Sequence, residues 1–131
     1  GIEQLPVRQV RSGDPQAWDA LFRRYQLPLY SYVYELVRDE QVSLDIVQET
    51  FINAARYLGS LRADGKFGSW IFGIAHQKCV QHWRKQSREK EILEGQGDLH
   101  DELPDDSEGP REWLIRREQE EEFMSLLNQL P

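Results

Sequence analysis

The sequence contains little cysteine and no long apolar run. Cys79 is the only cysteine of the 131 residues, so no disulfide framework and no cysteine-based metal cluster can form within the chain. A lone cysteine is typical of a reducing compartment, and we expect a cytoplasmic protein. No apolar stretch reaches the length of a membrane-spanning helix, and no signal peptide is visible at the start. We therefore expect no membrane span.

Acidic residues are missing from one long window. Residues 65–88 contain no Asp or Glu, although the composition of the chain predicts about 4 in a window of this length. The window holds basic and aromatic residues instead: Lys66, Phe67, Trp70, Phe72, Lys78, Trp83, Arg84, Lys85 and Arg88. Cations attract phosphate, and aromatic faces stack on unpaired bases. The window therefore predicts a nucleic-acid surface, in particular one for single strands.

The charge is divided unevenly along the chain. Residues 1–90 carry 13 Lys and Arg against 10 Asp and Glu, a net of +3, whereas residues 91–131 carry 3 against 13, a net of −10. An acidic tail on a mildly basic body is an asymmetry that accompanies nucleic-acid binding.

The sequence also lacks the motifs of enzymes. His76 and His82 are six positions apart, so they do not share a helical face as metal ligands, and His100 is the third and last histidine. No nucleophile–base pair, glycine-rich phosphate loop or paired-carboxylate spacing is present. We expect no enzymatic activity, no bound metal and no cofactor, with the histidines packed or solvated.

Apolar spacing of three and four residues predicts helices. Asp14-Pro15 favours a helix start, and Pro28 is expected to kink that helix or divide it before it ends near residues 38–40. A second helix is expected to be capped by Ser43 and stopped by Gly59. Its predicted buried residues are Leu44, Val47, Phe51, Ala54 and Leu58.

A third helix is expected from about residue 69 to residue 90. It should bury Phe67, Ile71, Ile74, Ala75 and part of Trp70. No segment alternates as a strand would, so we predict an all-α fold: a small helical bundle over residues 1–94. Residues 95–110 are rich in acids and in Gly and Pro and predict a flexible acidic linker. A further helix over residues 111–131 carries the apolar residues Trp113, Leu114, Phe123, Leu126, Leu127 and Leu130.

The segment DIVQETF carries a polar patch. Asp45, Gln48 and Glu49 lie at i, i+3 and i+4 and share one exposed face of the second helix. Such a patch can receive Arg side chains from a partner through charge-assisted hydrogen bonds. An ordinary solvated helix face is the alternative, and the spacing alone favours it.

Three segments in order resemble region 2 of bacterial RNA polymerase sigma factors, in the extracytoplasmic-function group. They are residues 13–25 (GDPQAWDALFRRY), 45–51 (DIVQETF) and 67–75 (FGSWIFGIA), within a resemblance that covers residues 12–88. The end of the chain, LLNQLP, resembles the lead-in to region 4. The resemblance therefore implies that residues 111–131 are the first helix of a truncated region 4.

The resemblance implies a sigma factor that directs the RNA polymerase core to promoters. Asp45, Gln48 and Glu49 would dock on the clamp helices of the polymerase β′ subunit. The third helix and the loop before it would recognise and melt the −10 element by capturing its non-template strand, with one base flipped into a pocket formed by the loop. The expected DNA-binding residues are Arg62, Asp64, Lys66, Gln77, Lys78, Gln81, Arg84, Lys85 and Arg88. An anti-sigma factor is an expected partner.

Several residues depart from the family pattern. Leu44 stands where an acid is common, Gly73 and Gln77 replace the commoner Arg and Asn, and Lys78 and Trp83 replace aliphatic residues. Phe67 and Trp70 are better explained as core residues than as stacking platforms, whereas Phe72 and Trp83 can serve either role. The competing hypothesis is a helical protein–protein interaction module without DNA binding.

Overall fold

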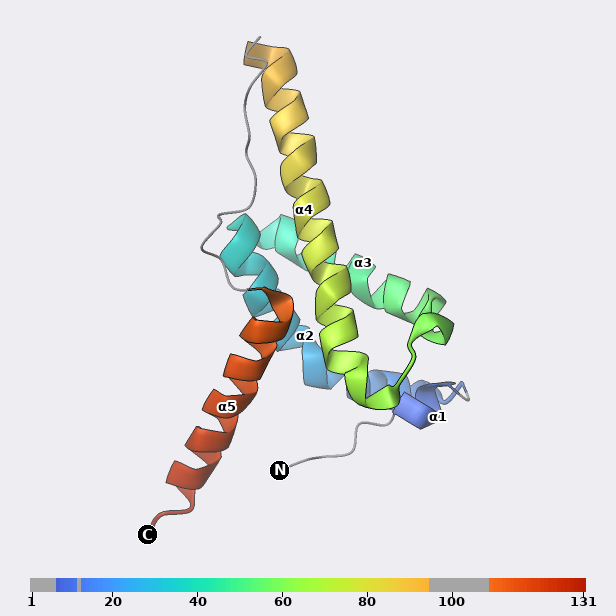
Figure 1. Cartoon of the computed structure of the whole chain (residues 1–131), viewed down its shortest axis with the longest axis vertical. Coiled ribbons are helices and arrows are strands. Elements are labelled where there is room, and N and C mark those ends of the chain that lie inside the picture. The colour runs from blue at the N-terminus through green and yellow to red at the C-terminus, as the bar shows by residue number, and fades with distance from the viewer. Residues whose placement is uncertain (1–6, 12, 95–108) are drawn as a thin grey trace.

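The computed structural model describes residues 7–11, 13–94 and 109–131, and within them it is helical throughout, without strands. The helices are α1 (Val7–Arg11), α2 (Pro15–Val37), α3 (Glu40–Arg56), α4 (Phe67–Glu94) and α5 (Pro110–Asn128), with short 3₁₀ turns η1 (Leu58–Ser60) and η2 (Asp64–Lys66). Figure 1 shows α4 running through the molecule and projecting beyond the bundle, while α5 extends in the opposite direction. The predicted all-α fold is confirmed.

The start of α2 is set by local chemistry, as expected. The Asp14 carboxylate accepts a hydrogen bond from the Gln16 amide at 2.9 Å, and Pro15 occupies the first turn. The helix continues through Pro28 to Val37, so Pro28 does not divide it, and the alternative that it kinks the helix stays a prediction. Neighbouring side chains such as Tyr25 and Leu29 are buried, and this packing holds the helix together across the missing backbone bond.

The start of α3 differs from the prediction. The N-cap is Asp39 and not Ser43. The Asp39 carboxylate accepts a hydrogen bond from the backbone amide of Val42 at 3.0 Å. Ser43 is buried, and its hydroxyl donates to the Asp39 carbonyl at 2.6 Å. Leu44 lies about 100° from Ser43 around the helix and is 52% exposed, so its predicted burial is wrong. The helix ends at Arg56, before Gly59.

The core gathers residues from α2, α3, α4 and the first turn of α5. The rest of the predicted apolar face of the second helix is buried, as are Phe67, Ile71 and Ala75 of α4, whereas Ile74 is only partly buried. The α4 helix begins at Phe67 and ends at Glu94, slightly longer at both ends than expected. Close packing at the start of α4 depends on Gly68, since a Cβ there would lie 3.0 Å from Leu114 Cδ2.

The first turn of α5 is embedded in this core. Trp113 is 2% exposed, its ring lies 5.5 Å from the rings of both Tyr32 and Phe72, and its indole N–H donates to the Glu35 carboxylate at 2.9 Å. The apolar residues predicted on this helix therefore divide into two groups. Trp113 and Leu114 are buried against the bundle, whereas the distal residues Phe123, Leu126, Leu127 and Leu130 are exposed.

The sequence-based linker lies largely outside the described residues. Of residues 95–110, only Gly109 and Pro110 are described, and Pro110 is the first residue of α5. The proposed boundaries of the domains stay predictions. Within the described part of the chain, no helix is both long and apolar enough to span a membrane.

Candidate nucleic-acid interface

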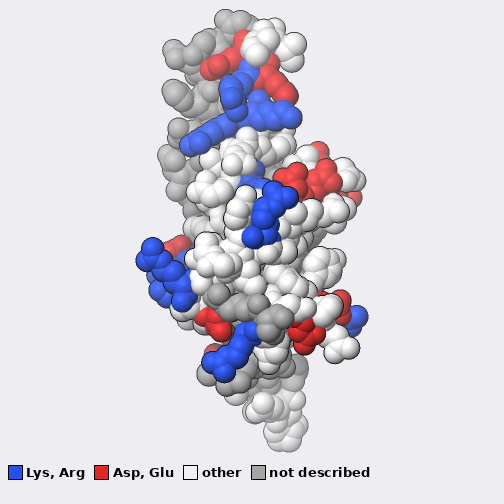
Figure 2. Space-filling model, turned by 90° about the vertical axis from the view of Figure 1, so that its right-hand side faces the viewer, with Lys and Arg blue, Asp and Glu red and all other residues white. Residues whose placement is uncertain are grey.

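The outer face of α4 carries a polar stripe. Gln77, Gln81, Arg84 and Arg88 are exposed and recur at helical spacing, so they lie in one row along the helix. Basic side chains gather over the upper part of the molecule, where α4 projects (Figure 2). These four residues are called the α4 stripe below. Their arrangement allows contact with an extended, negatively charged partner.

The α4 stripe is held in place by the inner face of the same helix. The Trp83 indole N–H donates to the Leu36 carbonyl at 3.1 Å and thereby ties the middle of α4 to the end of α2. Cys79 and Ala75 are completely buried below it. The stripe is therefore presented by a helix anchored in the bundle and not by a loop.

The aromatic residues of the acid-free window serve the core. Phe67 and Phe72 are fully buried, and Trp70 packs against the core. Trp83 is partly buried, and its indole N–H donates a hydrogen bond to the Leu36 carbonyl. The structure thus places Phe72 in the core, and it offers no face to a base. The stacking surface that the window predicted is not supplied by Phe67 or Phe72.

The loop before α4 lies at the opposite end of the helix from Arg88. Arg62 and Lys66 are exposed and Asp64 is partly buried, with the loop fixed between the buried side chains of Leu61 and Phe67. Since each helical residue advances 1.5 Å, Gln77 lies about 15 Å along the axis from Phe67 and Arg88 about 30 Å. The loop therefore lies just before the first turn of α4, and the stripe begins about 15 Å farther along the helix, so the two do not form one pocket.

The polar patch on α3 is exposed as predicted. Asp45, Gln48 and Glu49 face solvent, and the Asp45 carboxylate accepts a hydrogen bond from the side-chain amide of Gln41 at 3.1 Å. Two exposed apolar side chains, Leu44 and Ile52, also lie on α3. Sequence reasoning did not place them at the surface, because it assigned Leu44 to the core and passed over Ile52. Their exposure gives the patch an apolar border.

Lys78 differs from the other predicted DNA-binding residues. Its side chain is only 15% exposed, and its Nζ lies 3.6 Å from Oε2 of Glu49, whose side chain is 63% exposed. The ion pair joins α4 to the polar patch of α3. No local sequence signal reveals it, because it depends on how the two helices pack.

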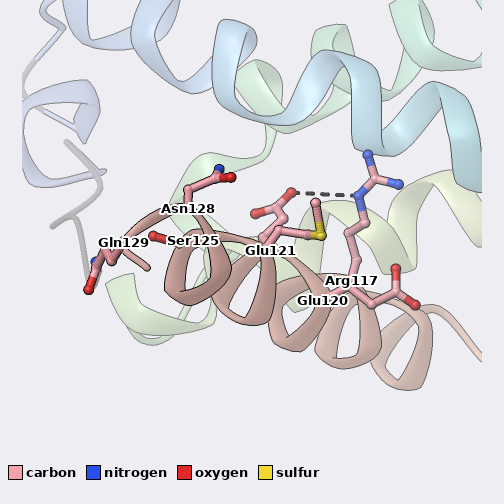
Figure 3. A pocket seen from close by; sticks show the side chains of 7 residues that line it. Arg117, Glu120, Glu121, Ser125, Asn128 and Gln129 are labelled. Atoms are coloured by element: carbon pink, nitrogen blue, oxygen red, sulfur yellow. Dashed lines mark ion pairs between the residues drawn. The ribbon is translucent and has the colours of Figure 1, made fainter. Parts of the chain in front are cut away.

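A hollow also lies along α5, lined by residues of that helix (Figure 3). Arg117 pairs with Glu121 at 3.5 Å, and Glu121 also reaches Arg24 of α2 at 3.4 Å. These pairs are partly exposed and contribute little to stability. Only the Arg24–Glu121 pair joins α5 to another helix, because Arg117 and Glu121 both lie on α5.

The buried titratable groups have structural roles. Burial lowers the pKa of His76, whose Nδ1 lies 2.8 Å from the Tyr32 hydroxyl. Burial also raises the pKa of Cys79 to about 12 and that of Tyr25 to about 12. A protonated thiol is a poor nucleophile at neutral pH. In the ranges that the structure describes, no three His, Cys, Asp or Glu residues come together as metal ligands.

Residues 21–89 match the family Sigma-70 region 2, which is more than half of the chain. The chain belongs to this family. RNA polymerase sigma-H factor of Pseudomonas aeruginosa is 31% identical to it over 139 residues, covering 98% of the chain and 69% of that relative. ECF RNA polymerase sigma-E factor of Escherichia coli (strain K12) is 37% identical over 86 residues, 66% of the chain and 44% of the relative. ECF RNA polymerase sigma factor BldN of Streptomyces coelicolor is 28% identical over 91 residues, 69% of the chain and 34% of the relative.

These relatives confirm the resemblance to sigma factors of the extracytoplasmic-function type. The chain spans about two thirds of the sigma-H factor and less than half of the other two relatives. Sigma factors direct RNA polymerase to promoters, so the family implies polymerase and promoter DNA as partners of this sigma factor. Every predicted site residue lies within the matched segment, while α5 lies outside it.

Proposed function

We propose that this sigma factor captures the non-template strand of the −10 promoter element along α4 and so helps to melt the promoter. The observation that carries the proposal is the α4 stripe, which lies in a segment free of acids on an anchored helix. Arg84 and Arg88 bind backbone phosphates, and Gln77 and Gln81 contact base edges. Lys85 adds a further cation beside the stripe.

The loop of residues 62–66 receives the flipped base in this proposal. Arg62 and Lys66 are exposed on either side of the partly buried Asp64, so cations for phosphate flank a hydrogen-bond acceptor. Extruding a base costs a few kcal/mol, and contacts in the pocket and to the adjacent phosphates offset that cost. The loop thus supplies sequence preference, while the cations of α4 supply affinity.

The polar patch of α3 docks on the clamp helices of the polymerase β′ subunit. Asp45, Gln48 and Glu49 are exposed for contact with Arg side chains, and the buried Val47 and Phe51 hold the helix from the opposite side. An anti-sigma factor that covered this patch or the α4 stripe would block initiation. Both surfaces lie on one rigid bundle, so docking on the polymerase positions the stripe for the DNA.

Strand capture is tested by comparing single-stranded and duplex DNA. We expect the chain to bind a single-stranded −10 oligonucleotide at least about tenfold more tightly than the matched duplex, because unpaired bases can enter the loop without the cost of melting. Fluorescence anisotropy over a range of salt concentrations measures both affinities. Equal affinity for the two forms would leave only a nonspecific cationic surface.

Polymerase docking is tested by the substitution Glu49→Arg. It should weaken binding to a β′ clamp-helix fragment about tenfold or more, because an Arg would face the basic side chains of the partner. Because the substitution also removes the ion pair with Lys78, it should lower the unfolding free energy by about 1 kcal/mol, which leaves the fold intact. Glu122→Arg, on the exposed part of α5, is the matched control and should bind normally. If Glu49→Arg and Glu122→Arg bound the clamp-helix fragment with equal affinity, the α3 patch would not be part of the polymerase interface.

A further inference from the structure

The end of α4 differs in character from the stripe that precedes it. Residues 65–88 contain no acid, whereas residues 89–94 (EKEILE) contain three. Residues 89–94 are called the α4 tip below. Figure 1 shows that the tip lies in the part of α4 that projects beyond the bundle, and in Figure 2 acidic side chains reappear above the basic group at that end. The acid-free surface available to a DNA strand therefore ends at Arg88.

The α4 tip carries two large apolar side chains that the bundle does not cover. Ile92 is 82% exposed and Leu93 is 85% exposed, more than any other large apolar residue in the part of the chain that the structure describes. They lie about 100° apart around the helix and form one apolar edge. Cys79 is the last buried residue of α4, and Ile92 lies about 20 Å beyond it along the axis. Packing within the bundle therefore does not explain this apolar pair.

We infer that the α4 tip makes a second contact with the RNA polymerase core, in an apolar groove with basic side chains at its rim. This inference rests on the proposed function, in which the polar patch of α3 makes the first contact. Ile92 and Leu93 enter the groove and leave water. Glu89 and Glu91 pair with the Lys or Arg side chains of the rim.

The charges of the α4 tip select a protein groove over nucleic acid. Glu89 and Glu91 directly precede the apolar pair, and their carboxylates repel the phosphates of a DNA strand. The same carboxylates attract the cations of a basic protein surface. A second copy of this chain fits less well, because its exposed apolar residues on α5 follow the acidic run EQEEE. Polymerase is the protein partner that the family implies.

The spacing of the two contacts determines how α4 is held. The ion pair of Lys78 with Glu49 places the polar patch of α3 beside Lys78, and Ile92 lies about 21 Å farther along the helix axis. One contact would let α4 turn about it, whereas two contacts fix its direction on the polymerase. Because both contacts belong to one rigid body, the second forms at high effective concentration and adds to the affinity.

The test compares the complete polymerase core with the β′ clamp-helix fragment, which offers only the first contact. Ile92→Ser with Leu93→Ser should weaken binding of the 131-residue chain to the core about tenfold, because the two apolar side chains no longer enter the groove. Binding to the fragment and to the single-stranded oligonucleotide should not change. The matched control, Leu27→Ser with Phe123→Ser, removes two exposed apolar side chains elsewhere and should bind the core normally.

Reversing the charges of the α4 tip separates a protein partner from DNA. Glu89→Lys with Glu91→Lys should weaken binding to the core, because the new cations face a basic rim. The same change should strengthen single-strand binding, because two cations then extend the α4 stripe. The salt dependence of strand binding should steepen by up to about 1.4, the value for two added contacts with a single strand. Effects of the same sign on both partners would overturn the assignment.

The remaining outcomes distinguish other occupants of the α4 tip. Unchanged core affinity of the Ile92→Ser, Leu93→Ser variant would overturn this inference alone. So would its loss of single-strand binding, which would assign the tip to DNA, or its loss of a dimer in sedimentation velocity, which would assign the tip to a second copy. A lower midpoint of urea denaturation would show that the tip packs within the chain and would also overturn the inference. If the wild type did not bind the core, the proposed function and this inference would fail together.

Discussion

Reversing two charges, Arg84→Glu with Arg88→Glu, should weaken binding to a single-stranded −10 oligonucleotide on the order of 100-fold at low salt. The double variant removes two phosphate contacts and places two carboxylates against the backbone. The slope of log affinity against log salt should become shallower by about 1.4, the value for two contacts with a single strand. Both side chains are exposed, so the fold should persist. Anisotropy titrations at several salt concentrations measure both quantities.

The matched control carries the same charge change elsewhere. Arg8→Glu with Arg23→Glu alters exposed residues of α1 and α2, away from the α4 stripe. Because charges beyond about 10 Å are screened at moderate salt, we expect less than about a threefold loss. Similar losses in both double variants would mean that net charge, and not the stripe, governs binding. Unchanged binding in both would favour the competing hypothesis of a protein–protein interaction module.

Trp113→Ala should lower the unfolding free energy by about 3–5 kcal/mol, the usual cost of removing a large buried aromatic side chain. Trp113 contacts the rings of Tyr32 and Phe72, and its loss also leaves the Glu35 carboxylate without the indole N–H. The change tests whether the first turn of α5 belongs to the core of the bundle. Urea denaturation followed by circular dichroism measures it.

Phe123→Ala is the control on the same helix. Phe123 is 60% exposed, so its truncation should change the unfolding free energy by less than about 0.5 kcal/mol. Equal losses for the two variants would contradict the contrast between the buried first turn and the exposed distal part of α5.

The limits of sequence reasoning are clearest at the helix starts. Asp14 and Pro15 form an unambiguous local signal, and the structure bears it out. Asp39 and Ser43 are both good capping residues within one turn of each other, so propensity alone could not separate them. Tertiary packing decides, because Ser43 is drawn into the interior while Asp39 stays at the surface to cap the helix.

Long-range contacts left no sequence signal. Trp113 and Phe123 have similar apolar character on one helix, yet only Trp113 meets the aromatic cluster of α2 and α4. Likewise, Lys78 and Lys85 are both lysines on the same side of α4, and the local sequence does not distinguish them. Only Lys78 forms an ion pair with Glu49. In contrast, helical spacing correctly predicted that the α3 patch is exposed. The roles of the α3 patch and of the α4 stripe in binding stay proposals.

The central claim is that α4 and the loop before it capture a specific single strand. Selection from a randomised single-stranded DNA pool, with the clamp-helix fragment present, tests it most directly. We predict that the wild type enriches one short motif and that the double variant Arg84→Glu with Arg88→Glu enriches none. The claim would be contradicted if the wild type enriched duplex-forming sequences or enriched no motif at all.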